Sequence, residues 1–235
     1  ERDPIFDKLG DLIDRVRTHR WLRLDADSSQ LVTEFFIRKV KLEPSNSQTY
    51  VELSLLLGPT EVVQLSNSFK LTKKEAALKA IELDPTNATA YVALAYCIKE
   101  GEVVIVGNHE MTTRQLYIKA IDVDPNNADA YIGLASHDKS GNVKLLSGQE
   151  MTKRQLFLKA IDVNPNIASS YLNLADILGD KESVMLHNDK KMTKKQLYLK
   201  AIDLQPYDFL AYRNLADMLD ANENIQLMNG QKMSE

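Results

Sequence analysis

The sequence has one cysteine, nine glycines and no long hydrophobic run. Cys97 cannot form a disulfide within the chain, so stability must come from buried apolar area. The longest apolar runs fall far short of the roughly 20 residues that cross a bilayer, which predicts no transmembrane helix and no membrane partner. No basic segment followed by an apolar stretch occurs near Glu1, and we expect a cytoplasmic piece of a longer protein.

A strong excess of charge of either sign is also lacking. The chain carries 29 Lys and Arg against 33 Asp and Glu, for a net charge of −4. Such a chain has no positive field to hold a phosphate backbone, so we expect no nucleic-acid partner and favour a basic one. With 44% hydrophobic residues, the composition is that of an ordinary globular protein and excludes disorder.

Motifs that carry catalysis are missing as well. The sequence has no glycine-rich phosphate loop and no nucleophile elbow. Its four histidines, His19, His109, His137 and His187, are far apart and have no carboxylate at metal-ligand spacing. Cys97 stands among apolar residues of an expected helix, where a buried, unreactive thiol is favoured. We therefore predict no catalytic residue, no metal and no cofactor.

What the chain does have is an internal repeat of about 40 residues. Five prolines follow one another at intervals of 41, 40, 40 and 41 residues, and a tyrosine stands six residues after each. The pairs are Pro44 and Tyr50, Pro85 and Tyr91, Pro125 and Tyr131, Pro165 and Tyr171, and Pro206 and Tyr212. A fixed period of this length indicates stacked structural units.

Each tyrosine lies in a predicted first helix of its unit. Apolar residues recur at spacings of three and four, as in Tyr91, Leu94, Ala95 and Ile98. The predicted N-caps are Asn46, Asn87, Asn127 and Asp208, with Asn166 in the remaining unit. Glycines stand where these helices are expected to stop: Gly58, Gly101, Gly141 and Gly179.

A second helix is predicted before each later proline, because a capping box, which marks the start of a helix, occurs before each of these four prolines. The boxes are Thr72 to Glu75, Thr112 to Gln115, Thr152 to Gln155 and Thr193 to Gln196. The residue before each threonine is Leu or Met and can pack on the fourth residue of the helix, Ala76, Leu116, Leu156 or Leu197. These contacts fix how the chain enters the helix.

Between the two helices of a unit the pattern alternates and is rich in β-branched residues. Short strands are predicted at 103–106, 143–146, 183–186 and 225–228. Residue pairs suited to a tight two-residue turn begin four residues before Leu71, Met111, Met151, Met192 and Met233: Asn67-Ser68, Gly107-Asn108, Ser147-Gly148, Asn188-Asp189 and Asn229-Gly230. The unit is therefore interpreted as helix, hairpin, helix, and the alternative is an irregular loop between the helices.

The junction between units resembles that of tetratricopeptide repeats. Lys79-Ala80-Ile81-Glu82-Leu83-Asp84-Pro85, followed by Ala90-Tyr91-Val92-Ala93-Leu94-Ala95, carries the resemblance, which covers about residues 35–219. That family's unit has about 34 residues, so the extra ones fall where the hairpin is predicted. The resemblance implies a mainly α fold, a right-handed α-solenoid of helical hairpins, and the residue pattern adds a short β-hairpin between the two helices of each.

The sequence departs from the family early in the second helix. The usual small residue there is replaced by Lys73, Thr113, Lys153 or Lys194. We expect the hairpin to replace the helix contact that the small residue normally makes.

The repeat predicts one solenoid domain with a degenerate N-terminal unit. Its parts are a unit or cap at 1–43, four repeats at 44–84, 85–124, 125–164 and 165–205, and a partial repeat at 206–235. The last residues, Met233-Ser234-Glu235, stand where another second helix would begin. We expect the natural array to continue, and the uncapped C-terminal unit to self-associate.

By resemblance to the family, a concave face would be lined by the first helices, at the residues one and five after each tyrosine. These are Val51 and Leu55, Val92 and Tyr96, Ile132 and Ser136, Leu172 and Asp176, and Arg213 and Asp217. The face changes from apolar to acidic along the chain. We therefore predict a non-catalytic scaffold that binds a protein or peptide segment with an apolar anchor at one end and Lys or Arg at the other.

Other interpretations stay open at this stage. The family includes grooves that clamp a terminal carboxylate, but Asn173 and Asn214 have no matching lysine here. The apolar members of the face could be contacts between neighbouring helices, the acids a solvated surface, and the hairpins a second binding surface. The chain could also be a regulatory or substrate-recruiting arm of a larger enzyme, or a structural subunit of a large assembly.

Overall fold

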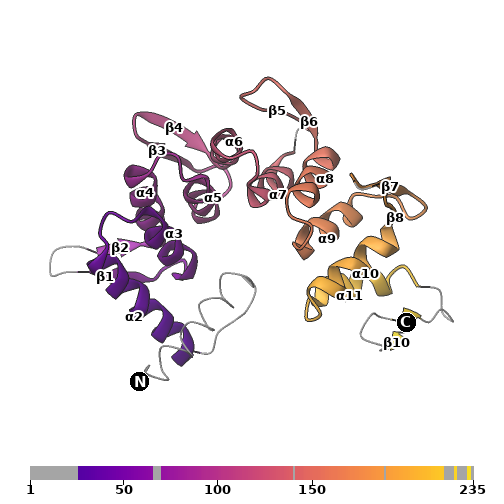
Figure 1. Ribbon diagram of the computed structural model, residues 1–235, viewed down its shortest axis with the longest axis horizontal. Helices are drawn as coiled ribbons and strands as arrows, with labels where there is room; N and C mark the ends of the chain where they lie inside the picture. Colours follow the sequence, from indigo (N-terminus) through magenta and orange to yellow (C-terminus); the bar gives the residue numbers. More distant parts are fainter. Residues whose placement is uncertain are drawn as a thin grey trace. The chain divides into compact units, whose positions relative to one another are not determined.

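The computed structural model describes residues 26–65, 70–139, 141–187, 189–219, 225–226 and 232–233 (Figure 1). This part of the chain is mainly helical, as predicted. It divides into two compact units, Glu1–Leu116 and Tyr117–Glu235, where the sequence predicted a single domain. The expected helix near Phe6 and the turns at Asn67-Ser68 and Asn229-Gly230 lie outside the described residues.

The first unit alternates helices with short strand pairs. Its elements are α2 (Ala26–Leu42), α3 (Ser47–Leu56), β1 (Val62–Gln64), β2 (Lys70–Thr72), α4 (Lys73–Leu83), α5 (Ala88–Cys97), β3 (Val103–Val106) and β4 (His109–Thr112). Helix α6 (Thr113–Val123) begins at its end and continues into the second unit. Helix α3 contacts α2, α4 and α5, so it is enclosed by helices on several sides.

The second unit repeats this order. Its elements after α6 are α7 (Ala128–His137), β5 (Asn142–Lys144), β6 (Glu150–Thr152), α8 (Lys153–Val163), α9 (Ala168–Asp176), β7 (Ser183–Met185), β8 (Lys191–Thr193), α10 (Lys194–Leu204), α11 (Phe209–Ala216), β9 (Ile225–Gln226) and β10 (Lys232–Met233). The helices that carry the repeated tyrosine, α3, α5, α7, α9 and α11, are called first helices below. Those that begin with a capping box, α4, α6, α8 and α10, are called second helices.

The starts of the second helices and of α3, α5, α7 and α11 lie where the sequence predicts them. Each second helix begins with reciprocal capping bonds; Thr152, for example, donates its backbone N–H to Gln155 Oε1 at 2.8 Å and accepts the N–H of Gln155 on Oγ1 at 3.2 Å. The predicted N-caps of α3, α5, α7 and α11 are confirmed, each with a side-chain oxygen that accepts a backbone N–H.

The N-cap predicted at Asn166 is wrong. Ile167 caps α9 and has no side-chain group for the task, while the backbone N–H of Asn166 donates to Asn164 Oδ1 at 3.0 Å. Asn166 therefore belongs to the turn before the helix.

The glycines predicted to end the first helices stand beyond the actual ends. The C-caps are Leu57, Ile98, Asp138 and Ile177. Leu57 and Ile98 are in extended conformation and buried, so the chain leaves the helix in order to bury these side chains. Gly101 and Gly141 have φ of +80° and +86° and serve the following turn, a conformation that other residues rarely adopt.

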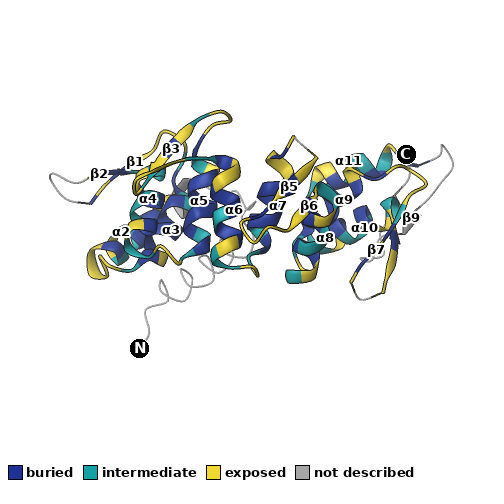
Figure 2. Cartoon of the chain, turned by 90° about the horizontal axis from the view of Figure 1, so that it is seen from above, coloured by how far each residue is buried: buried dark blue, intermediate teal, exposed yellow. Residues whose placement is uncertain are grey.

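Within each repeat of about 40 residues, two antiparallel strands separate the first helix from the second helix. One cross-strand pair in each has its side chains directed to the interior: Val63 with Leu71, Val104 with Met111, Val143 with Met151, and Val184 with Met192. The strands β2, β6 and β8 contact α4, α8 and α10, the second helices that follow them. Residues facing the other way, such as Val103 and Ile105, are exposed, while the first helices α3, α5, α7 and α9 are largely buried (Figure 2).

The repeated tyrosine and proline are joined by a hydrogen bond. The Oη of Tyr50, Tyr91, Tyr131 and Tyr171 donates to the backbone oxygen of the proline six residues earlier, at 3.2, 3.1, 3.1 and 3.0 Å. Each tyrosine is nearly fully buried. The bond satisfies the one polar atom of a core side chain and ties each first helix to the turn before it, which explains the constant spacing.

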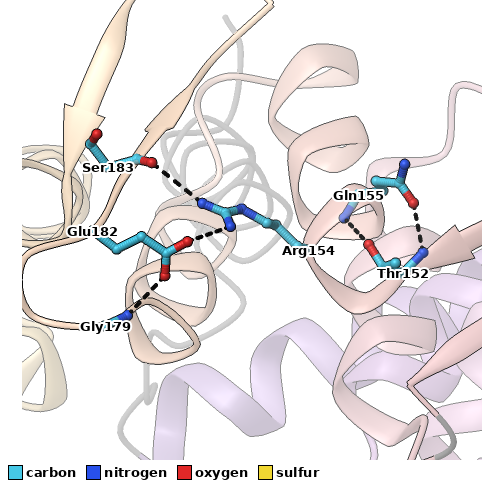
Figure 3. A network of polar contacts seen from close by, with 6 residues as sticks. All are labelled: Thr152, Arg154, Gln155, Gly179, Glu182 and Ser183. Atoms are coloured by element: carbon cyan, nitrogen blue, oxygen red, sulfur yellow. Dashed lines mark hydrogen bonds and ion pairs between the residues drawn. The ribbon is translucent and has the colours of Figure 1, made fainter.

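A second recurring contact ties the start of a second helix to the loop after the next first helix. Arg154 of α8 donates to Glu182 Oε1 at 2.5 Å and to the backbone oxygen of Ser183 at 3.4 Å (Figure 3). Glu182 also accepts the backbone N–H of Gly179, and these two bonds lower the pKa of its carboxyl. In the first unit Lys74 and Glu102 form the corresponding ion pair. We interpret this contact as structural, because its charged side chains are bonded to each other.

Candidate functional site

Four of the predicted binding residues are buried. Val51, Val92, Ile132 and Leu172, one residue after the tyrosine, have exposed fractions of 0%, 1%, 7% and 7%. Their apolar side chains pack between helices, as the contacts of α3 with α2, α4 and α5 illustrate. This corrects the prediction that they line a face open to a partner; they are contacts between neighbouring helices.

The other predicted residues reach the surface. In the first unit Tyr96 is 43% exposed and Leu55 is half-buried. In the second unit the exposed residues are Ser136, Asp176, Arg213 and Asp217, and the half-buried ones are Asn173 and Asn214. Their part in binding stays a prediction, but their positions allow contact with a partner.

Three helices of the second unit meet at the carboxylate of Asp176. This residue is the last of α9. Its Oδ1 accepts a hydrogen bond from Tyr198 Oη of α10 at 2.7 Å and another from Asn214 Nδ2 of α11 at 2.9 Å. Two uncharged donors thus hold an exposed negative group in one position, and both bonds from these described residues fall on Oδ1. We call Asp176, Tyr198 and Asn214 the Asp176 network.

Tyr198 is the member of the network that the sequence did not reveal. It occupies the same place in its helix as Tyr117 and Phe157, which are buried, so its pattern is that of a core residue. Its ring is indeed buried, and only the hydroxyl reaches Asp176. Burial, and then the hydrogen bond to the Asp176 carboxylate, raise the pKa of Tyr198, so the phenol stays protonated and continues to donate.

Arg213 adds a positive charge beside the network. Its Nε and Nη2 donate to Asn214 Oδ1 at 3.4 and 3.3 Å, and its guanidinium lies 5.5 Å from the centre of the Phe209 ring. The Asn214 amide therefore connects the cation of Arg213 to the anion of Asp176. Asp217, one turn further on, has no place in this chain of hydrogen bonds among the contacts that the structure describes.

The chemistry of this surface is that of binding. Fixed hydrogen-bond acceptors and one arginine can position a partner. Cys97 is half-buried, its Sγ donates to the backbone oxygen of Ala93 at 3.0 Å, and burial raises the pKa of its thiol to about 11, so little thiolate forms at neutral pH. Among the described residues no group of three or more His, Cys, Asp or Glu could hold a metal ion.

No helix in the described part of the chain is both long enough and apolar enough to cross a bilayer. A comparison with curated proteins returns no match. A family model described as Tetratricopeptide repeat matches residues 156–196, which run from α8 through α9 and the strands β7 and β8 to the start of α10. This match supports the tetratricopeptide-repeat family for the chain, and repeats of that family generally mediate protein–protein interaction.

Proposed function

We propose that the chain is a non-catalytic scaffold for protein–protein interaction, and that the Asp176 network binds a segment that carries Lys or Arg. The family match supports the general function. The recurrence of the same capping boxes and Tyr–Pro bonds outside residues 156–196 supports extending the repeat over the described chain, as units of about 40 residues with a hairpin in each.

The observation that carries the proposed site is the fixed, exposed carboxylate of Asp176. Within the described part of the chain, the two hydrogen bonds that it accepts come from the neutral side chains of Tyr198 and Asn214, and no cation is bonded to it. An incoming ammonium or guanidinium group would form a charge-assisted hydrogen bond with a carboxylate that is already positioned, which reduces the entropy lost on binding. Asp217 lies near the end of α11 and adds a second exposed acid in the same unit.

Replacing Asp176 by Asn is expected to weaken binding of a basic peptide at least about tenfold, because one charge-assisted bond contributes roughly 1.5–3 kcal/mol. The Asn side chain keeps an oxygen for Tyr198 and Asn214, so the network can persist without the charge. The probe is a panel of labelled peptides with one apolar anchor and Lys or Arg at varied spacing, and binding is followed by fluorescence anisotropy.

Asp203→Asn is the matched control. Asp203 lies on α10 of the same unit, pairs with Lys200 at 3.3 Å and is outside the Asp176 network. It removes the same charge, so a general effect of net charge would weaken binding equally in both variants. Equal affinities for the parent chain and Asp176→Asn, or equal losses in the two variants, would refute the proposed site.

A further inference from the structure

The hairpin of β3 and β4 differs from the other three hairpins whose faces the structure describes. Two cross-strand pairs lie on the exposed face of each hairpin, and in those three the pair nearer the turn contains a lysine. These pairs are Gln64 with Lys70, Lys144 with Glu150, and Met185 with Lys191. In β3 and β4 the same pair is Ile105 with Glu110. Lysine at an edge discourages the pairing of a further strand, so this hairpin lacks a protection that the others have.

The backbone of β3 has a free edge on the side away from β4. Opposite residues of an antiparallel pair alternate between those that bond to each other and those whose N–H and C=O point outward. The backbone N–H of Thr112 donates to Gln115 Oε1 at 2.8 Å, so it points away from β3. The pair of Thr112 with Val103 is therefore of the outward kind, and so is the pair of Ile105 with Glu110. Among the described residues no third strand joins this sheet.

The edge of β7 shows how another repeat uses the same groups. Ser183, the counterpart of Val103, accepts a hydrogen bond from Arg154 on its backbone oxygen at 3.4 Å. Beside β3 the place of Arg154 is taken by Lys74, whose ammonium pairs with the carboxylate of Glu102. No bond of the Arg154 kind reaches the backbone of Val103 within the described part of the chain, so the edge of β3 stays open.

The side chains along this edge are apolar and exposed. Val103 is 46% exposed and Ile105 is 66% exposed, and both are β-branched, the kind that favours strand pairing. Strand β3 lies between the repeats 44–84 and 125–164, both of which follow it or precede it in full, so its edge is not the open end of the array. An exposed strand with these properties is open to the addition of another strand.

The free backbone groups fix the register of an added antiparallel strand. One of its residues exchanges two hydrogen bonds with Ile105, and the residue two positions later exchanges two with Val103. Both direct their side chains to the exposed face, beside those of Ile105 and Val103. The residue between them turns its N–H away from β3 and makes no bond to the edge.

Glu110 determines which side chain fits beside Ile105. Its carboxylate is exposed and forms no ion pair within the described part of the chain. The added strand would lie about 10 Å from β4, which is twice the spacing between strands. A Lys or Arg side chain can cross this distance to meet the Glu110 carboxylate, and its methylene groups then cover Ile105. A β-branched residue two positions later stands beside Val103.

We propose that the edge of β3 binds an extended segment of a partner protein by strand addition, and that this segment contains Lys or Arg, any residue, and then Val or Ile. A second copy of β3 fits less well, because its Val103 would stand beside Ile105 and would bring no cation to Glu110. The site lies in the first unit and the Asp176 network in the second, so either can fail without the other.

The test uses the 235-residue chain and a labelled peptide with blocked ends, Ser-Thr-Arg-Thr-Val-Thr-Ser, with binding followed by fluorescence anisotropy. N-methylation of the Arg or the Val backbone nitrogen removes a hydrogen bond to β3 and is expected to weaken binding about tenfold. N-methylation of the Thr between them, whose N–H points away, should change the affinity by less than about twofold. Equal effects at the two kinds of position would overturn strand addition.

Variants of the chain test the same edge. Ile105→Lys copies the pair of Lys144 with Glu150 in the next hairpin, so it is expected to fold. It should weaken binding about tenfold, because the new lysine pairs with Glu110 and repels the arginine of the peptide. Val62→Lys is the matched control, since it adds the same charge at an exposed position of β1 in the same unit and should leave the affinity unchanged.

Glu110→Lys tests the charge that selects the partner. It is expected to weaken binding of the arginine peptide about threefold, the size of effect typical of an exposed ion pair. A peptide with Glu in place of Arg should bind this variant better than it binds the parent chain. Circular dichroism verifies the folding of every variant.

Three results would overturn the proposal. They are a parent chain that does not bind the peptide, an Ile105→Lys variant that binds it as the parent does, and a loss of binding in Asp176→Asn, which would assign the peptide to the Asp176 network. Sedimentation velocity adds a fourth: a parent chain that dimerises while Ile105→Lys stays monomeric would assign the edge to a second copy.

Discussion

Gly133→Ala is expected to lower the free energy of unfolding by about 3 kcal/mol, the upper part of the range for overpacking a well-packed core. A Cβ at this position of α7 would lie well inside 3.0 Å of three ring atoms of Tyr117. That ring is fully buried and therefore has no free space to move into. In an ordinary helix interior the same substitution stabilises by up to about 1 kcal/mol. The sign of the change in the free energy of unfolding therefore distinguishes a clash with Tyr117 from the ordinary gain in helix propensity. Urea unfolding followed by circular dichroism measures it.

The corresponding positions in the first unit suggest a control for Gly133→Ala. In the first unit the positions that correspond to Tyr117 and Gly133 are Ala77 and Ala93, both fully buried, so a small residue on the second helix accompanies an alanine on the first. In a Tyr117→Ala background, Gly133→Ala should therefore raise the free energy of unfolding by about 1 kcal/mol. An equal cost in both backgrounds would show that contact with Tyr117 is not the cause.

Leu174→Ala is expected to cost about 3 kcal/mol, within the range for removing a fully buried leucine side chain. Leu174 is 0% exposed and stands three residues after the repeated tyrosine, like Leu53, Leu94, Leu134 and Leu215, which are equally buried. Each of these leucines lies in the core of its 40-residue repeat, so its removal leaves a cavity.

Leu146→Ala is the matched control for Leu174→Ala. Leu146 follows strand β5, is 63% exposed and should change the free energy of unfolding by less than about 0.5 kcal/mol. Similar losses for the two variants, measured by the same urea titration, would contradict the assignment of Leu174 to the core.

The starts of the helices could be predicted because the signals are local. A capping box needs only residues three apart in the sequence, and the reciprocal bonds at Thr72, Thr152 and Thr193 are present. The ends of the first helices could not be predicted in the same way. There the chain leaves the helix to bury Leu57 or Ile98, a choice that depends on the packing of distant residues and not on the nearby glycine.

The candidate site could be predicted only in part for the same reason. Asp176 was identified by its spacing from the repeated tyrosine and Asn214 by comparison with grooves that clamp a carboxylate, and the structure joins them by a hydrogen bond. Tyr198 was missed because an aromatic residue with the period of the core gives no sign that its hydroxyl reaches a carboxylate 22 residues away. Val51 and Leu172 were placed on the face by the same spacing, although their apolar side chains favour burial.

We infer that each unit of about 40 residues is built as helix, strand, strand, helix. Its most direct test is an NMR measurement of contacts between protons of Val143 and Met151 and of the backbone chemical shifts around Thr152. We expect cross-strand contacts in the paired register and helical shifts that begin at Lys153. Helical shifts that run through Thr152 into the preceding residues, without contact between Val143 and Met151, would contradict it.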